Sequence, residues 1–513
     1  MMYTILDCYT DEAAGLGVPP YLGTYPRYVY GYLNKKNTKY ITIDDLRLFK
    51  KYEGKEKEIT LKDKSQISTY NLTKNDIKKV LEKTKTLIVI VGVHVPGKYL
   101  SALPGTLKEV SELIKDIKCF KILTGPAVYG NQLLGGKFSE SVPLLKKDVH
   151  EKNQGVFDEV SVNQGVFDEV SVNQGVFDEV SVNFFRFGYD EVSKISIKGA
   201  EILKQIKDPR VIEIETGRGC DIGKCSFCTE PIKNRVEYRD KKDVLNEIKE
   251  FYKLGAEYFR LGKNTCFYSY PEAVSLLKDL KKLKLKVLHI DNVNPVKVMM
   301  DKNDEITKTI VDVCTSGNIA AFGVESFDSK VVKENNLNCS PEVALKAIKK
   351  INEIGGEKGE NGLPKFLPGI NIIFGLIGES KKTHKENMKY LKKILDSNLL
   401  LRRINIRQAA VLPGTQLMKE AGNKFLRKNK KYYWKWRNEI RSKIDNEMLK
   451  KVVPKNTILK ECYAEIYDGN KTFLRQFGTY PLVIGVEGRL ELKKFYNVKV
   501  LEHMQRGLGG EVI

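Results

Sequence analysis

Three cysteines lie close together in one loop of this 513-residue chain: Cys220, Cys225 and Cys228. Three thiolates at this spacing can bind three irons of a cubane [4Fe–4S] cluster. The fourth iron would have no protein ligand and could bind a substrate or cofactor, so the pattern indicates an enzyme. Two alternatives stay open. The C-x2-C pair also occurs in zinc sites, although no histidine lies near this loop in sequence, and the thiols could be structural.

The residues around the cysteines carry a family resemblance. The run Glu215-Thr216-Gly217-Arg218-Gly219 leads from a predicted strand into a loop that ends in Cys225-Ser226-Phe227-Cys228. This loop resembles the cluster loop of radical S-adenosylmethionine (SAM) enzymes, in which an aromatic residue, here Phe227, precedes the last cysteine. The usual spacing in that family is C-x3-C-x2-C. Here it is C-x4-C-x2-C, which lengthens the loop and keeps the number of ligands.

Apolar strands alternate with amphipathic helices after the cysteine loop. We expect strands near residues 258–262, 287–291, 319–326, 370–380 and 407–415, with helices such as 341–354 and 381–395 between them. This alternation predicts an α/β fold with a parallel sheet. The number of units matches the partial (β/α)6 barrel of radical SAM enzymes, in which ligands bind at the carboxyl ends of the strands.

The resemblance also implies a cofactor site. Cys220, Cys225 and Cys228 would ligate the cluster, and SAM would bind its open iron. A single electron would then release a 5′-deoxyadenosyl radical that abstracts a hydrogen atom from the substrate. The electron would come from a ferredoxin- or flavodoxin-like partner. The residues expected near SAM are Phe227, Gly262, Glu325, Ser326, Asn371, Gly375, Leu412 and Pro413. Glu325 and Ser326 would face the ribose, whereas Gly375 and the Leu412–Pro413 segment would face the adenine. The residues that act on the substrate are not encoded in these motifs.

Composition shifts along the chain predict five regions. These are a Rossmann-like domain (1–128), a linker (129–195), the barrel (196–422), a basic aromatic helical segment (423–461) and a small β-rich tail (462–513). The linker contains the decapeptide NQGVFDEVSV three times, at 153–162, 163–172 and 173–182. A tolerated loop insertion explains these copies better than a solenoid, for which three units are a minimum.

The first region bears on two further cofactors. Many radical SAM enzymes have a cobalamin-binding domain here, with the ligand motif Asp-x-His-x-x-Gly. Gly92-Val93-His94-Val95-Pro96-Gly97 keeps the histidine and glycine but lacks the aspartate that would orient the imidazole, so cobalamin is not expected. Only Cys8 and Cys119 occur in this region, which argues against the second cluster that methylthiolating enzymes use.

A charge of +22, from 87 Lys and Arg against 65 Asp and Glu, favours an anionic partner such as nucleic acid. A hyperthermophile-like charged surface is the alternative. The densest basic stretch, Lys424–Lys443, holds nine Lys or Arg against one acid and contains both tryptophans, Trp434 and Trp436. It could bind RNA through cations and aromatic rings, or pack its rings on the barrel. The tail loosely resembles the RNA-binding module that ends tRNA-methylthiolating radical enzymes.

The start of the chain lacks the features of a signal peptide, and no apolar run reaches the length of a membrane span, so a cytoplasmic location and reduced thiols are expected. The leading hypothesis is a radical SAM enzyme that modifies RNA. One alternative is a radical SAM enzyme that acts on a small molecule or a protein. The other is a non-enzymatic nucleic-acid-binding protein with structural zinc.

Overall fold

A computed structural model describes residues 2–8, 22–34, 37–60, 66–92, 105–125, 176–181, 187–412 and 414–513. The described residues divide into two compact units. The first comprises those up to Ile212 together with Asn246–Ala256, and the second comprises Glu213–Leu245 and Glu257–Ile513. None of the helices in these ranges combines the length and the apolar composition that a membrane span requires.

The first unit contains a parallel sheet with the strand order β2-β1-β5-β6-β7. Every residue of the central β5 is buried, as expected for a strand covered on both faces. This confirms the Rossmann-like α/β fold expected at the start of the chain, whereas the bounds 1–128 stay a prediction. Its strands are β1 (Tyr3–Asp7), β2 (Thr38–Thr42), β5 (Thr86–Ile90), β6 (Phe120–Thr124) and β7 (Glu179–Val180). Its helices include α1 (Thr24–Leu33), α2 (Ile43–Tyr52), α3 (Ile77–Lys83), α4 (Leu107–Ile114) and α6 (Tyr189–Gly199), and β3 (Lys57–Thr60) forms a hairpin with β4 (Gln66–Thr69).

Two sequence predictions for this unit fall largely outside the described residues. The incomplete cobalamin motif from His94 to Gly97 is one of them. The decapeptide copies are the other, except for residues 176–181 of the last copy. In that copy β7 pairs with β6, and Val176 and Phe177 pack against the core of the unit. One copy therefore supplies the sheet with an edge strand.

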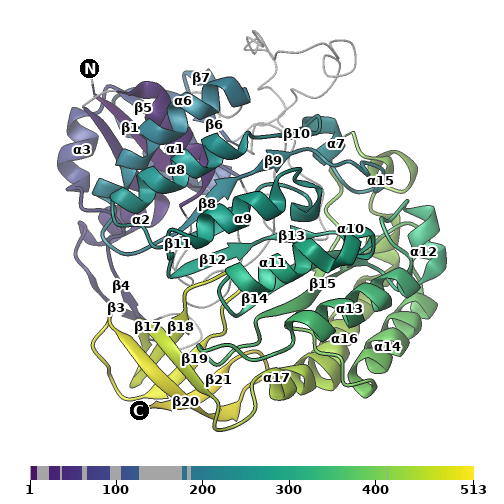
Figure 1. The fold of residues 1–513 in the computed structure, drawn as a ribbon. Helices are drawn as coiled ribbons and strands as arrows, with labels where there is room; N and C mark the ends of the chain where they lie inside the picture. The colour runs from purple at the N-terminus through teal and green to yellow at the C-terminus, as the bar shows by residue number, and fades with distance from the viewer. Residues whose placement is uncertain are drawn as a thin grey trace. The chain divides into compact units, whose positions relative to one another are not determined.

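The second unit contains the predicted partial (β/α)6 barrel (Figure 1). One parallel sheet has the order β12-β11-β8 and the other has the order β13-β14-β15-β16; only Asp291 separates β12 from β13. The strands are β8 (Val211–Glu215), β11 (Tyr258–Gly262), β12 (Val287–Ile290), β13 (Asn292–Val293), β14 (Asn318–Glu325), β15 (Phe366–Phe374) and β16 (Arg403–Gln408). Helix α8 (Lys241–Lys253) is divided between the two units, and the helices that lie wholly in the second include α9 (Ala273–Lys281), α11 (Glu305–Val313), α13 (Pro341–Gly355) and α14 (Lys381–Asp396).

The last barrel strand differs from the prediction. It was expected at 407–415, but β16 spans Arg403–Gln408. Arg403, Asn405 and Arg407 are half-buried and alternate with the buried Ile404 and Ile406. This period of two is typical of a strand, but its polar side chains made the apolar run from Ala409 look like the better candidate.

The basic segment forms helix α16 (Lys424–Ile440), followed by a π-helical turn η7 (Arg441–Asp445) and α17 (Asn446–Val452). The buried residues of α16 recur at intervals of three and four, as on one face of an amphipathic helix. They are Leu426, Asn429, Tyr433, Trp436 and Ile440. The lysines lie on the remaining surface of the helix, so the segment has one packed face and one exposed basic face.

The tail forms a small β-barrel, as predicted, although its first strand begins at Ile458. Strand β17 pairs with both β18 and β20, which closes the strands into a ring. The strands are β17 (Ile458–Asp468), β18 (Lys471–Gln476), β19 (Ile484–Glu487), β20 (Phe495–His503) and β21 (Leu508–Val512). Buried apolar residues such as Leu459, Val486 and Val498 fill its interior.

One segment of the tail, Phe477–Tyr480, packs directly on strands of the larger barrel. The Phe477 ring stacks on Tyr258 with a centroid distance of 4.3 Å. The Thr479 N–H donates to His289 Nδ1 (2.9 Å). The Tyr480 hydroxyl donates to Asp291 Oδ1 (3.3 Å). The tail barrel is therefore held against β11 and β12 by both apolar and polar contacts.

Replacing Gly478 by alanine should loosen this docking, because the added Cβ would lie 2.7 Å from Cε1 of His289. We expect the free energy of unfolding to fall by about 1–3 kcal/mol, the usual cost of overpacking. Thermal denaturation followed by circular dichroism measures this. Gly188→Ala is the control, since a Cβ there meets no atom within 4 Å. Equal melting temperatures for the two variants would contradict the docking.

Candidate active site

The cysteine loop begins at the carboxyl end of β8, and its two ends are tied together. Strand β9 (Gly217–Arg218) pairs with β10 (Glu237–Tyr238) across the base of the loop. Gly219 has φ +82°, and a Cβ there would lie 2.3 Å from the Arg235 carbonyl oxygen, so only glycine fits. The Gly219 N–H donates to Glu230 Oε1 (2.9 Å). These contacts fix where the three thiols are presented.

The three cysteine thiols lie in a partly buried environment with few compensating charges. Burial, followed by Cys228, Glu325 and Cys220, raises the pKa of Cys225 to about 12. Burial also raises the pKa of Cys228 to about 11. The thiols are therefore close enough to disfavour one another's ionisation. A bound cation would reverse this, since it holds the sulfurs as thiolates and releases their protons.

Two of the three cysteine sulfurs already accept hydrogen bonds from the backbone. Backbone N–H groups point at two of the sulfurs: Gly223 N–H donates to Cys220 Sγ (3.4 Å) and Glu230 N–H to Cys228 Sγ (3.4 Å). Such bonds stabilise thiolate ligands. Within the described ranges, no three Cys, His, Asp or Glu side chains converge as ligands of one ion. A cubane cluster does not require that convergence, because each thiolate binds a different iron.

Asn335, which follows helix α12 (Ser329–Glu334), links the cysteine loop to the loop after β15. The Ser226 hydroxyl donates to Asn335 Oδ1 (2.6 Å), and the Ser226 N–H donates to the Asn335 carbonyl (2.9 Å). The Ile377 N–H donates to Asn335 Oδ1 (3.1 Å), and Asn335 Nδ2 donates to the Ile377 carbonyl (2.9 Å). The sequence analysis missed this residue because no motif marks it. The structural role of a buried asparagine can be recognised only when its hydrogen-bond partners are known.

Glu325 lies at the carboxyl end of β14, where its backbone adopts a φ of +62°. Its side chain is only 9% exposed, and Oε2 has no hydrogen-bond partner among the described residues. Burial raises its pKa to about 7, and Arg407 opposes that shift. Because Glu325 in turn raises the pKa of Cys225, the fold brings this predicted ribose ligand close to the cysteine loop.

Ser326 and Asn371 already have partners within the fold. Ser326 is buried, and its hydroxyl oxygen accepts a hydrogen bond from the Asp328 N–H (3.1 Å). The side-chain amides of Asn371 and Asn405 lie 2.9 Å apart on neighbouring strands. Contact with the cofactor stays a prediction for both.

Gly262 is packed against a carboxylate. A Cβ there would lie 2.8 Å from Glu213 Oε1. Glu213 Oε1 also pairs with Arg260 Nη2 (2.9 Å), and Asp291 Oδ2 pairs with the same nitrogen (2.7 Å). This buried charge network requires a small residue at position 262, in addition to any contact with SAM.

Gly375 follows β15 and has φ +97°. A Cβ there would lie 2.3 Å from Leu426 of α16, so the glycine is needed for helix packing. The Gly375 N–H donates to Glu379 Oε2 (2.7 Å), and Asn429 Nδ2 donates to Glu379 Oε1 (2.8 Å). Burial raises the pKa of Glu379 to about 7. Glu379, which the sequence analysis did not single out, thus holds this loop against α16.

Phe227 and Leu412 are two further residues that were expected near SAM. Phe227 packs against the cluster that includes Leu376 and Leu417. The Leu412 carbonyl accepts a hydrogen bond from the Thr415 hydroxyl (2.7 Å). Pro413 lies outside the described residues. An apolar cluster therefore lies next to the cysteine loop, and contact of Leu412 and Pro413 with the adenine stays a prediction.

The sequence of this chain matches a family model and several known proteins. The family model of the radical SAM superfamily matches residues 214–391. An uncharacterized protein of Methanocaldococcus jannaschii is 40% identical, with 99% of this chain and 93% of that protein covered. A tRNA-2-methylthio-N(6)-dimethylallyladenosine synthase of Caldicellulosiruptor saccharolyticus is 24% identical, with 56% of this chain and 59% of that protein covered.

Among solved structures, a radical S-adenosylmethionine methyltransferase from Kitasatospora setae aligns with a TM-score of 0.47 and 12% identity, covering 81% of this chain and 76% of the other. That structure contains cobalamin and a [4Fe–4S] cluster. The expectation that cobalamin is not bound by this chain has no support from the comparisons and stays a prediction.

Replacing Asn335 by alanine should release the cysteine loop from the loop after β15. Buried hydrogen-bonding groups left without partners cost about 1–3 kcal/mol each, so we expect a lower melting temperature and a lower iron content after reconstitution. Lys333→Ala, an exposed change two residues away, is the control. If Asn335→Ala binds iron and melts like the control, this link does not position the loop.

Proposed function

Because the chain belongs to the radical SAM superfamily, we propose that Cys220, Cys225 and Cys228 hold a [4Fe–4S] cluster that serves the reductive cleavage of SAM. The supporting observation is the tied cysteine loop at the carboxyl end of β8, with Glu325 close to it. The chemistry that such a cluster and SAM supply together is a 5′-deoxyadenosyl radical able to abstract a hydrogen atom. A ferredoxin- or flavodoxin-like protein would provide the electron.

The chain's own residues have defined tasks in this proposal. The buried Glu325 has a free carboxylate oxygen that can accept hydrogen bonds from ribose hydroxyls. The apolar cluster beside Phe227 can cover the adenine and exclude water. Asn335 and Glu379 keep the surrounding loops in place by hydrogen bonds. Glu325, Phe227 and the three cysteines are thus the residues that would contact the cofactors.

The cluster can be tested by metal analysis. Anaerobically reconstituted protein should bind about four irons and show the broad visible absorption of a cubane cluster. Alanine at Cys220, Cys225 or Cys228 should abolish this, since the remaining two thiolates cannot retain the cluster. Cys314→Ala is the matched control. Burial alone raises the pKa of that thiol, and the cysteine loop makes no contribution to it. Stoichiometric zinc without iron uptake would refute the proposal.

The SAM site can be tested separately from the cluster. With a strong reductant, the protein should convert SAM slowly to 5′-deoxyadenosine. Glu325→Ala should weaken SAM binding about tenfold, the loss of roughly 1.4 kcal/mol expected for hydrogen bonds to a charged group, while iron content is retained. Glu353→Ala on the exposed face of α13 is the control. Unchanged SAM affinity in Glu325→Ala would show that the ribose site lies elsewhere.

We further propose RNA as the substrate, on the evidence of α16. The structure divides the two tryptophans of this helix: Trp434 is 63% exposed, whereas Trp436 is 5% exposed and packs on Phe374 and His384. The Arg437 guanidinium lies 5.3 Å from the Trp434 ring centroid. An exposed ring beside cations suits a base that stacks next to its phosphate. The partial relative that is named as a tRNA-modifying synthase supports the same class of substrate.

The two tryptophans provide a matched pair of variants. Trp434→Ala should weaken binding of single-stranded RNA by about 1–3 kcal/mol and leave the melting temperature unchanged, because an exposed stacking surface is lost. Trp436→Ala should lower the free energy of unfolding by about 3–5 kcal/mol, because it leaves a cavity in the core. Filter binding and thermal denaturation measure the two effects. Absence of RNA affinity in the wild type at low salt would favour a small-molecule or protein substrate.

A further inference from the structure

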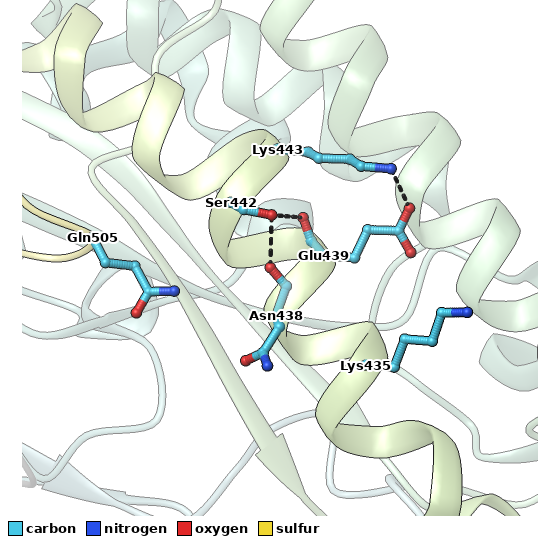
Figure 2. Close-up of a pocket in the computed structure, with 6 residues that line it drawn as sticks. All are labelled: Lys435, Asn438, Glu439, Ser442, Lys443 and Gln505. Atoms are coloured by element: carbon cyan, nitrogen blue, oxygen red, sulfur yellow. Dashed lines mark hydrogen bonds and ion pairs between the residues drawn. The ribbon is translucent and has the colours of Figure 1, made fainter.

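A surface pocket of about 790 Å³ lies where α16 and η7 meet the turn between β20 and β21 (Figure 2). It is lined by Lys435, Asn438, Glu439, Ser442, Lys443 and Gln505. The turn is fixed in place, because Asn446 Nδ2 donates to the Met504 carbonyl (2.8 Å) and Met504 N–H donates to the Gly507 carbonyl (2.9 Å). The pocket therefore has two stable walls, one from the basic helix and one from the tail barrel.

The single carboxylate in this pocket is already neutralised. Glu439 accepts hydrogen bonds from Lys443 Nζ (2.8 Å) and His384 Nε2 (2.9 Å). These two hydrogen bonds, of which the one from Lys443 has the larger effect, lower the pKa of Glu439 to about 2. By contrast, the side chains of Lys435, Asn438 and Gln505 have no hydrogen bond or ion pair with the described residues. One cation and two amides thus stay available for a ligand.

Two arginines are sequence neighbours of residues that line this pocket, since Arg437 precedes Asn438 and Arg506 follows Gln505. Arg437 and Arg441 lie on successive turns, and Arg441 Nη1 donates to the Ile404 carbonyl (2.6 Å), next to Arg403. Arg506 lies next to Gln505 in the turn. Burial is the largest cause that lowers the pKa of Arg506, and the charges of Arg441, Arg403 and Arg437 add to it, so that the pKa is about 10. Asp445, paired with Arg441, is the carboxylate that opposes this shift.

Two further features suggest that this cluster is built for a ligand. Arg441 is almost fully buried, yet its Nε has no hydrogen-bond partner among the described residues. The helix also changes to π-helical geometry over Arg441–Asp445, and such segments are frequent at functional sites. Neighbouring guanidinium groups repel one another, and a bound anion would relieve that repulsion. Guanidinium groups also match the geometry of phosphate.

We propose that a backbone phosphate of single-stranded RNA binds to Arg437 and Arg506, with Asn438 and Gln505 forming hydrogen bonds to the adjoining nucleotide. This inference rests on the proposed RNA substrate and states where on the protein the RNA strand binds. The exposed Trp434 lies one turn before Asn438, so a stacked base and its phosphate would both contact this end of α16. The RNA strand then passes from the exposed face of α16 to the tail barrel.

The test uses the full-length protein and a single-stranded oligoribonucleotide over a range of salt concentrations. Arg437→Gln and Arg506→Gln should each flatten the slope of log affinity against log salt by roughly 0.7, the value for one lost phosphate contact on a single strand. Lys282→Gln, which removes an exposed charge at the end of α9, should leave the slope unchanged. The double variant Asn438→Ala/Gln505→Ala should lower affinity without changing the slope, because its side chains are neutral.

The outcomes separate this inference from the proposed function. If the wild type binds RNA but Arg437→Gln and Arg506→Gln have the slope of Lys282→Gln, the phosphate site is wrong and the RNA substrate stands. If the wild type binds no RNA at low salt, the RNA substrate fails and the inference fails with it. Binding of inorganic pyrophosphate without RNA would assign the site to a small phosphorylated ligand and overturn the proposal. Melting temperatures equal to that of the wild type establish that the variants are folded.

Discussion

The hydrogen bonds of Asn335 are the constraint on which the site depends. They join the loop that presents the three cysteines to the loop that follows β15, and Glu379 holds that second loop against α16. Neither loop belongs to a strand or helix, so regular secondary structure alone cannot fix their separation. Two buried polar side chains with satisfied hydrogen bonds provide the rigidity, as fully connected buried polar networks do elsewhere.

The barrel and the cysteine loop could be predicted because their signals are local. Apolar strands with short spacers, glycines between them and a three-cysteine spacing are all visible in one stretch of sequence. The last strand, β16, was misplaced because its alternate residues Arg403, Asn405 and Arg407 are polar. Asn335 and Glu379 were missed for a related reason. Their importance comes from partners that are 42 to 109 residues away in sequence, and a single sequence does not show which distant residues meet.

Helix α16 shows how a sequence ambiguity is resolved by periodicity. The basic aromatic segment supported two hypotheses, RNA binding and packing on the barrel, which were treated as exclusive. The buried positions follow a three–four spacing that includes Tyr433 and Trp436 and leaves Trp434 outside. Both hypotheses can therefore hold for different residues of one helix. The spacing was available in the sequence, and applying it residue by residue would have separated the two tryptophans.

The tail barrel changes how the basic helix should be understood. Its Phe477–Tyr480 segment packs on β11 and β12, and Arg403, at the start of β16, lies 3.8 Å from the Tyr480 ring centroid. The same arginine belongs to the cluster with Arg437, Arg441 and Arg506. The guanidinium groups thus come from the barrel, the helix and the tail, and only the docked arrangement concentrates them. A freely tethered tail would leave those charges apart, so the docking of the tail and the electrostatics of the proposed phosphate site have one structural origin.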